Sequence, residues 1–457
     1  MKFTFISLLV SLIPLFSSTT HAQRSAADYF EEGNTKARTG DFTGAVKDFG
    51  TVISMNPDHA PSYYNRGLAK ASLKDQRGAI MDYDKAIELD GKVALYYESR
   101  GVSKSLQENF TSAVQDYSKA IDLDQEQAKA YYNRGVSYAK LNNLRMAISD
   151  LDKALALEPD DIPALYARGN CKQDLQEYAG SLADFTRVIE LSPKRTGAYG
   201  SRGLAKLELG DYQGAIGDFT KALDLSPNES WYYNNRGFAK NKLEDFESAI
   251  LDFNKTIEMD SENFEAYYGR GFAKNKLYDL KGAIQDMDIA IILKSNYPEL
   301  PKKKFYQFRA KAPVVESTLN RENLDQLRNQ VPSNPKITAI TTDRSEAYYI
   351  RGISKSRISQ NREAIKDLTK AIELTPSYTD AFYARALINS EEGNQIAAIH
   401  DYSSAIKTKN SFSEAYYLRG ITKIHVGQTN EGCLDLSKAG EMGYQQSYKV
   451  ISTYCNQ

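Results

Sequence analysis

An Arg-Gly pair that returns at a constant interval constrains the fold more than any other feature of this sequence. The pair stands at residues 66–67, 100–101, 134–135, 168–169, 202–203, 236–237 and 270–271, and again at 351–352 and 419–420. With Ala60 as position 1 of a 34-residue repeat, Arg occupies position 7, Gly position 8 and a bulky side chain position 24. Such a period indicates a row of similar repeats that stack, because one repeat cannot bury its own apolar face.

Each repeat is predicted to form two antiparallel helices, an A helix followed by a B helix. Apolar residues recur at three- and four-residue spacing over residues 63–73 and again over residues 78–89. Small residues at positions 8 and 20, such as Gly67 and Ala79, let the two helices approach closely. Pro at position 32, as in Pro57, ends the B helix because it lacks an amide donor and clashes with the preceding turn.

The motif Tyr-Tyr-Asn-Arg-Gly-Leu-Ala-Lys at residues 63–70, with its phased copies, resembles the tetratricopeptide repeat (TPR) family in a bacterial variant. The resemblance covers residues 26–444. It implies an all-α TPR superhelical solenoid of about 11–12 helix-turn-helix repeats. Eight repeats are expected in residues 26–297, three in residues 345–444, and a C-terminal capping helix in residues 445–457.

The sequence departs from the family at position 7, where Arg replaces a frequent Leu and an Asp accompanies it at position 23. Arg168 with Asp184, and Arg202 with Asp218, are examples. We expect each pair to link an A helix to a B helix, within one repeat or across to the next. An alternative is that these Arg side chains bind an anionic ligand.

The strict period breaks between the two blocks of repeats, at residues 298–344. Arg270 and Arg351 differ by 81 in residue number, which exceeds one period by 47. Residues 305–311 echo the Tyr-Tyr-x-Arg-Gly motif, which favours a degenerate repeat over an irregular linker between two blocks. Basic and aromatic residues also mix at 302–311, but a solvated loop is favoured, and a net charge of −1 gives no reason to expect nucleic acid.

Residues 1–22 are predicted to be a signal peptide. Lys2 precedes an apolar stretch at residues 3–16, and small residues at Thr20 and Ala22 favour cleavage before Gln23. The predicted product is exported to the periplasm, the cell envelope or the exterior, with an uncleaved anchor as the alternative. No later segment is apolar enough for stable membrane insertion.

A disulfide between Cys433 and Cys455 is predicted, with two free thiols as the alternative. Both lie eleven residues from Tyr444, at a turn between the last B helix and the capping helix, and exported proteins keep disulfides. Cys171 is predicted to be a small buried residue. The sequence holds no recognisable catalytic, metal-binding or cofactor-binding motif, so neither an enzyme nor a cofactor is expected.

The TPR resemblance implies that A helices line a concave groove and contact polypeptides through positions 2, 5, 9, 12 and 13. Carried onto this chain, the candidate groove residues are Tyr64, Tyr132, Tyr166, Tyr268, Tyr349, Tyr383, Tyr417, Phe238, Phe272, Asn241 and Asn275. Tyr offers a large contact area with few rotatable bonds, although packing between helices is an equal alternative for the position-5 residues. The family's carboxylate clamp needs Lys at position 5 and Asn at position 9, so that clamp is not expected.

The sequence therefore predicts a non-catalytic scaffold that binds a protein or peptide in a groove of Tyr and aliphatic side chains. Binding of a glycan or another non-protein ligand in the same groove is the alternative. Nothing in the sequence identifies the partner.

Overall fold

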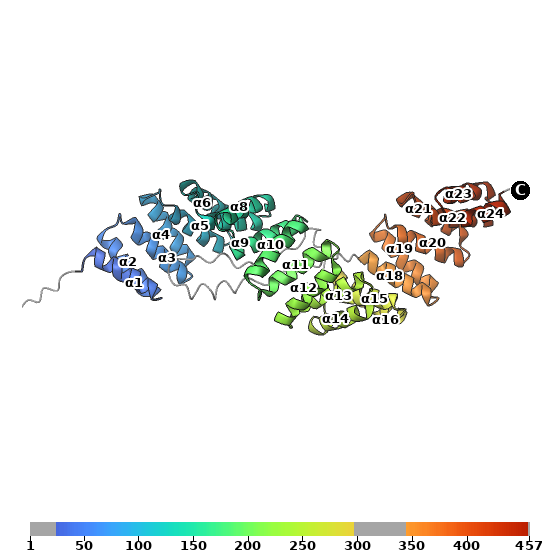
Figure 1. Ribbon diagram of the computed structural model, residues 1–457, viewed down its shortest axis with the longest axis horizontal. Coiled ribbons are helices and arrows are strands. Elements are labelled where there is room, and N and C mark those ends of the chain that lie inside the picture. The colour runs from blue at the N-terminus through green and yellow to red at the C-terminus, as the bar shows by residue number, and fades with distance from the viewer. Residues whose placement is uncertain (1–23, 297–343, 456–457) are drawn as a thin grey trace, which may run out of the picture. The chain divides into compact units, whose positions relative to one another are not determined.

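The computed structural model describes residues 24–296 and 344–455, which form 23 α-helices and no strand (Figure 1). Two compact modules are present among them. Module 1 comprises residues 24–143, and module 2 comprises residues 144–296 and 344–455. The predicted signal peptide at 1–22 and the interruption at 298–344, apart from its last residue, lie outside the described residues.

Module 1 consists of three complete A–B pairs and one further A helix. Its helices are α1 (Ala26–Arg38), α2 (Phe42–Met55), α3 (Ala60–Ser72), α4 (Gln76–Leu89), α5 (Ala94–Leu106), α6 (Phe110–Leu123) and α7 (Ala128–Lys140). Each helix packs against the next one along the chain.

Module 2 begins with a B helix and ends with a capping helix. Its first part contains α8 (Leu144–Leu157), α9 (Ile162–Asp174), α10 (Tyr178–Leu191), α11 (Thr196–Glu208), α12 (Tyr212–Leu225), α13 (Ser230–Lys242), α14 (Phe246–Met259), α15 (Phe264–Lys276) and α16 (Leu280–Asn296). Its second part contains α18 (Arg344–Arg357), α19 (Asn361–Leu374), α20 (Thr379–Glu391), α21 (Gln395–Thr408), α22 (Ser413–His425), α23 (Thr429–Glu441) and α24 (Gln446–Tyr454).

The turn from A helix to B helix depends on two consecutive positions of the repeat. Position 15 adopts a left-handed conformation, with φ of 66° at Lys74 and 81° at Gly210. Such a φ is unfavourable for most residues other than Gly and Asn, and in several repeats a side-chain cap at position 16 helps to stabilise the turn. Asp75 and Asp211, at that position, cap the B helices by accepting hydrogen bonds from backbone amides three residues later.

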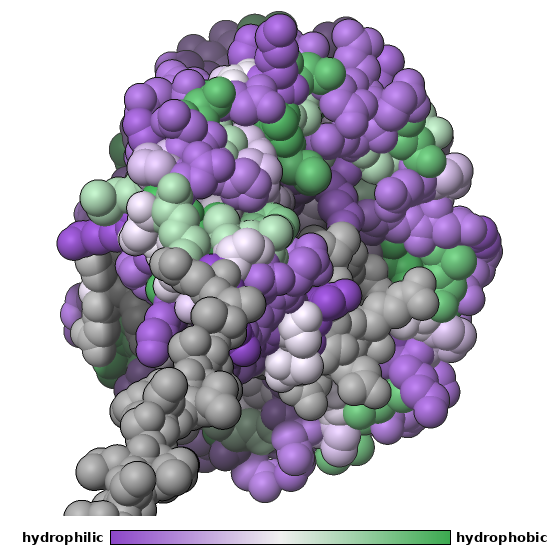
Figure 2. All heavy atoms as spheres, turned by 90° about the vertical axis from the view of Figure 1, so that its left-hand side faces the viewer, coloured by the Kyte–Doolittle hydropathy of each residue, from purple (hydrophilic) through white to green (hydrophobic). Residues whose placement is uncertain are grey.

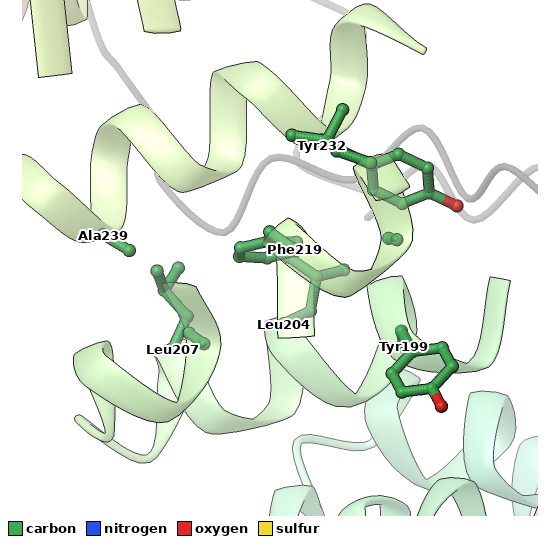
Figure 3. Packing of buried hydrophobic residues seen from close by; sticks show 9 residues of the cluster. Tyr199, Leu204, Leu207, Phe219, Tyr232 and Ala239 are labelled. Atoms are coloured by element: carbon green, nitrogen blue, oxygen red, sulfur yellow. The ribbon is translucent and has the colours of Figure 1, made fainter. Parts of the chain in front are cut away.

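The core of each repeat forms where the bulky position-24 side chain meets the glycine at position 8. A Cβ added to Gly67 would lie 2.6 Å from the ring of Tyr83, which is fully buried. Figure 3 shows the equivalent arrangement around Phe219 of α12, which packs with Leu204 of α11 and Tyr232 of α13. Each core is thus shared between a repeat and the next A helix, which explains why the repeats stack.

The stack continues without interruption from α16 to α18, although residues 297–343 separate these helices along the chain. The two helices pack directly against each other and lie side by side in Figure 1. Met287 and Ile291 of α16 form one buried cluster with Ala347 and Ile350 of α18. In the described part of the stack, α18 thus follows α16 directly. The prediction of a degenerate repeat rather than a linker at 298–344 falls outside the described residues, apart from residue 344, and stays a prediction.

The two helices pack directly because α18 presents the same apolar face as any following A helix. It therefore satisfies the exposed side of α16 directly. The residues interpreted as remnants of a repeat, 305–311, lie outside the described part of the chain.

The last helix, α24, covers the end of the stack by packing on α23. Cys433 on α23 and Cys455 just after α24 form a disulfide, with their Cα atoms 5.8 Å apart. Gly443, with φ of 90°, provides the turn between the two helices. Among the described residues, no helix has both the length and the apolar character needed to span a membrane.

Candidate functional site

The A helices lie on the closely spaced side of each module. Neighbouring A helices contact one another: α1 with α3, α3 with α5 and α5 with α7 in module 1, and α9 with α11, α11 with α13, α13 with α15, α15 with α18 and α18 with α20 in module 2. No successive B helices of the described residues meet to this extent. The A-helix side is therefore where one extended ligand meets the most repeats per unit of length.

The Arg at position 7 forms a two-pronged contact with the Asp at position 23 of the same repeat. In Arg202, Nε donates to Asp218 Oδ2 at 2.8 Å and Nη2 donates to Oδ1 at 2.7 Å. Arg168 contacts Asp184 in the same way, at 3.0 and 2.5 Å. The same pairing occurs between Arg66 and Asp82, Arg100 and Asp116, Arg236 and Asp252, Arg270 and Asp286, Arg351 and Asp367, Arg385 and Asp401, and Arg419 and Asp435.

The remaining Arg nitrogen, Nη1, bonds to position 25 of the preceding repeat. It reaches Asp152 from Arg168 at 2.7 Å, and Thr220 from Arg236 at 3.1 Å. Except for Arg66, whose preceding repeat has Gly50 at position 25, each of these Arg residues thus joins the two helices of its own repeat and also the B helix before it. The Asp218 hydrogen bond raises the pKa of the Arg202 guanidinium, against the opposing effect of burial. With its donors engaged in this way, the position-7 Arg acts as a structural link, and the anion-binding alternative loses support.

Sequence reasoning missed two further members of this cluster, a Lys at position 11 and a Tyr at position 4. Lys206 Nζ lies 2.9 Å from Asp218, so one buried carboxylate faces two cations. The Arg202 guanidinium lies over the ring of Tyr199, 5.8 Å from its centroid. Both residues recur in the Tyr-Tyr-x-Arg-Gly-x-x-Lys motif, which was the available signal.

The position-5 Tyr residues reach forward to the following A helix. The hydroxyl of Tyr64 lies 3.3 Å from Ser99 Oγ, and that of Tyr166 lies 3.3 Å from Ser201 Oγ. Burial raises the pKa of both phenols. These residues pack between repeats, which was one of the two alternatives open from the sequence. Tyr132 of α7 is half-buried.

Four of the candidate groove residues lie in the interior of module 2. Phe238 is 3% exposed and its ring packs edge-on against Phe253 at 5.1 Å. Asn241 donates to the Gly269 carbonyl at 2.9 Å, and Asn275 donates to Ser354 Oγ at 2.7 Å. Tyr166 is also buried. The structure places these side chains between helices: Phe238 lies against α14, Asn241 against α15 and Asn275 against α18.

The other candidates of module 2 form a continuous, half-buried row on α15, α18, α20 and α22. We call this row the A-face strip. It consists of a Tyr at position 5 and an apolar residue at position 9 on each helix: Tyr268 and Phe272, Tyr349 and Ile353, Tyr383 and Leu387, and Tyr417 and Ile421. Positions 5 and 9 are one helical turn apart and therefore share a face.

The same face on α9, α11 and α13 is closed. There, Tyr166, Gly200, Asn234, Leu204 and Phe238 are all buried, and only Asn170 is half-buried. Large side chains are thus accessible on the last four A helices and not on the three before them.

Three aromatic pairs lie along the A-face strip, each formed by a position-5 Tyr and an aromatic residue that precedes the next helix. Ring centroids are 5.1 Å apart for Tyr349 and Tyr378, and 4.7 Å apart for Tyr383 and Phe412. Tyr417 and Tyr444 complete the set at 4.6 Å. Tyr268 instead donates a 2.7 Å hydrogen bond to Glu346 of α18.

The described surface also carries exposed apolar side chains on B helices, such as Met81, Leu251, Ile396 and Leu434, which are 68–72% exposed. Viewed from the α1 end, it is mainly hydrophilic, with separate apolar patches (Figure 2). No cluster of His, Cys, Asp and Glu suited to a metal ion occurs in the described ranges. Burial raises the pKa of the Cys171 thiol to about 12, so this residue is an unreactive part of the core.

Comparisons with known proteins agree with the repeat pattern. Family profiles described as tetratricopeptide repeat match residues 30–94, 128–161, 166–230, 232–263 and 345–378, and one described as TPR repeat matches residues 106–142. These matches together span more than half of the chain. A comparison with curated proteins finds no match.

Several solved structures are similar over part of the chain. MamA from Desulfovibrio magneticus RS-1 is 24% identical over 37% of this chain and 96% of its own, with a TM-score of 0.36. YrrB, described as a TPR protein with an unusual peptide-binding site, is 26% identical over 39% and 92%, with a TM-score of 0.37. A protein from Parabacteroides merdae is 21% identical over 54% and 98%, with a TM-score of 0.40. From its constant period, its stacked helix pairs and the family profiles, the chain belongs to the tetratricopeptide repeat family.

Proposed function

We propose that this protein is a non-catalytic scaffold that binds an extended segment of a partner protein on the A-face strip. TPR folds serve as protein-interaction scaffolds, and no enzyme family matches the chain. The observation that carries the proposal is the row of half-buried Tyr and aliphatic side chains on four neighbouring A helices of module 2. Rows of accessible apolar groups on a repeat protein mark interaction surfaces.

A glycan is the second candidate ligand, and the aromatic pairs favour it. Rings such as Tyr349 with Tyr378 offer flat surfaces on which sugar rings stack. A polypeptide is the better match to the strip as a whole, because aliphatic residues at position 9, such as Ile353 and Leu387, suit apolar side chains rather than hydroxyl-rich sugars.

Export to the cell envelope or beyond is part of the proposal. It is supported by the signal-peptide features of residues 1–22 and by the Cys433–Cys455 disulfide, since disulfides persist in oxidising compartments. N-terminal sequencing of the protein from an envelope or culture fraction should begin at Gln23. A product that begins at Met1 and fractionates with the cytosol would contradict export.

Crosslinking of the native chain, followed by mass spectrometry, tests the binding proposal. Crosslinks to the partner are expected beside the strip, and the double variant Tyr268→Ala with Tyr349→Ala should lose the partner while keeping its helical circular dichroism. In the matched control, Leu251 and Leu434 are replaced by Ala. These two side chains are 68% and 72% exposed, and lie on the B helices α14 and α23 respectively. A partner that is lost from the control and kept by the double variant would contradict the proposal, and a glycan-array signal without a protein partner would favour the glycan.

A further inference from the structure

We infer that the A-face strip takes a partner segment in which Arg or Lys alternates with apolar residues, because acidic side chains stand beside the aromatic rings along it. This inference rests on the proposed function and adds the chemistry of the partner. The surface involved is confined to α15, α18, α20 and α22.

Acidic residues at position 2 follow the strip. Glu346 of α18 is half-buried, and Asp380 of α20 and Glu414 of α22 are exposed. None of these three carboxylates forms an ion pair with any residue of the described chain; Glu346 accepts only the hydroxyl of Tyr268. Their negative charges are therefore available to a ligand on this face.

This acidic row is specific to the region of the strip. The earlier A helices carry Pro61, Leu95, Lys129, Pro163, Gly197 and Trp231 at position 2. The carboxylates thus accompany the accessible aromatic and aliphatic residues and are absent from position 2 wherever the face is closed in module 2. A general acidic character of the protein does not explain them, since its net charge is −1.

Each of two junctions combines a carboxylate with an aromatic pair. Asp380 lies two residues after Tyr378, and Glu414 lies two residues after Phe412. The carboxylates lie near the Tyr rings. Burial first, and then the charge of Asp380, raise the pKa of Tyr349. Burial and a hydrogen bond to Glu414 raise the pKa of Tyr383.

A cation at such a junction gains an ion pair and a ring face together. The chain already shows that these rings accept cations, because Lys409 Nζ lies 5.1 Å from the centroid of Phe412.

Apart from Lys409 beside Phe412, positive groups of the same face lie at its other end. Position 13 holds Lys276 and Arg357, which contact Phe272 and Tyr278 respectively. Positions 2 and 13 are about 16 Å apart along a helix at 1.5 Å per residue. The edge of the strip at position 2 is therefore negative, while the position-13 edge is mixed, with Glu391 on α20 and His425 on α22.

The spacing of the junctions suggests the spacing of basic residues in the partner. Neighbouring A helices that contact each other, such as α18 and α20, have axes about 10 Å apart. An extended chain advances about 3.3 Å per residue. One basic residue in every three would therefore meet successive junctions, with apolar residues between them against positions 5 and 9.

Binding of synthetic peptides to the full processed chain tests this inference. The probes are capped peptides of about twelve residues with Leu and Ser between Arg residues at every third position, and matched peptides with Gln or Glu in place of Arg. Fluorescence anisotropy should show that the Arg peptide binds at least about tenfold more tightly than the Gln peptide, with the difference shrinking at high salt.

A charge-neutral variant, Glu346→Gln with Asp380→Asn and Glu414→Gln, should bind the Arg and Gln peptides with similar affinity. The matched control, Glu247→Gln with Glu363→Gln and Glu431→Gln, removes three exposed carboxylates from B helices and should bind like the parent.

The outcomes separate the inference from the proposed function. If the parent binds the Gln peptide as tightly as the Arg peptide, and loses both on Tyr268→Ala with Tyr349→Ala, the scaffold proposal stands and the basic partner is wrong. If no peptide binds while crosslinking still finds a partner beside the strip, the scaffold proposal stands and the basic partner is wrong.

Two other occupants have their own readouts. Stronger Arg-peptide binding after Lys302→Ala with Lys303→Ala and Lys304→Ala would assign the strip to the chain's own basic segment. A dimer that is lost in the charge-neutral variant would assign it to a second copy. Either result would contradict the inference.

Discussion

Arg351 Nη1 lies 2.6 Å from Asp288 Oδ1, and these residues are 63 positions apart. The equivalent contact elsewhere, as from Arg168 to Asp152, spans 16 positions. The difference of 47 (63 less 16) equals the length of the segment 297–343. The contact between repeats is thus preserved across this segment of the chain, because α18 packs on α16 as the next A helix.

Deletion of residues 298–344 should therefore give a folded protein. It joins Tyr297 to Ser345 and restores a step of one repeat between Arg270 and Arg351. We expect the free energy of unfolding to change by about 1 kcal/mol or less, because shortening a loop alters closure entropy only slowly. Denaturant titration followed by circular dichroism measures it. Loss of cooperative unfolding would mean that the segment contributes to the core of module 2.

Substitution of Asp184 by Ala should destabilise module 2 by about 1–3 kcal/mol. The carboxylate is 5% exposed and faces both Arg168 and Lys172, so its removal leaves two partly buried cations without their partner. Asp152→Ala is the control, because that carboxylate is 55% exposed and should contribute less than about 1 kcal/mol. A double-mutant cycle between Arg168 and Asp184 should show coupling, and additive losses would contradict a specific pair.

Two glycines in helices of module 2 should respond to Ala with opposite signs. A Cβ on Gly269 would lie 2.3 Å from the ring of buried Phe253, so Gly269→Ala should cost about 1–3 kcal/mol. Gly217 has no atom within 4 Å of such a Cβ, and Gly217→Ala should stabilise α12 by up to about 1 kcal/mol. Thermal unfolding of both variants measures this, and equal shifts would contradict the packing described for position 6 of α15.

Reduction of the Cys433–Cys455 disulfide should loosen α24. A closed loop of 22 residues is worth about 3 kcal/mol in the chain-entropy model. Hydrogen exchange should accelerate in residues 446–454 and hardly change in α15. In the native protein, alkylation should label no thiol before reduction and two after it, since Cys171 is buried and its pKa is raised to about 12. Labelling of Cys433 without reductant would show that the bond does not form.

Stability should fall at alkaline pH because of the buried Tyr residues. Burial raises the pKa of Tyr166 above its ordinary value of about 10, and holds that of Tyr268 well above it. Above pH ~10 the unfolded chain releases these protons while the folded chain keeps them. The stabilisation is complete below pH ~10 and is lost as the pH rises toward the folded-state values. Unfolding at several pH values, with tyrosinate absorbance, tests this, and Tyr268→Phe should reduce the slope.

The sequence by itself determined the helices and their pairing. The fixed period placed Arg at position 7, Gly at position 8 and a bulky residue at position 24, and residues three and four apart share one helical face. Arg202 with Asp218, and Cys433 with Cys455, were deducible because both partners recur or lie symmetrically in the chain. All of these depend on spacing along one or two helices.

Only the tertiary structure decided how each helix meets the next repeat. It placed α18 directly on α16, put Phe238 and Asn241 in the interior, and left Tyr349 and Tyr383 half-buried beside Asp380 and Glu414. A repeat motif fixes which side of a helix is apolar. How much of that side remains accessible depends on the size of side chains from the next A helix, which can lie one repeat further along the chain or, as for α18, beyond a long insertion.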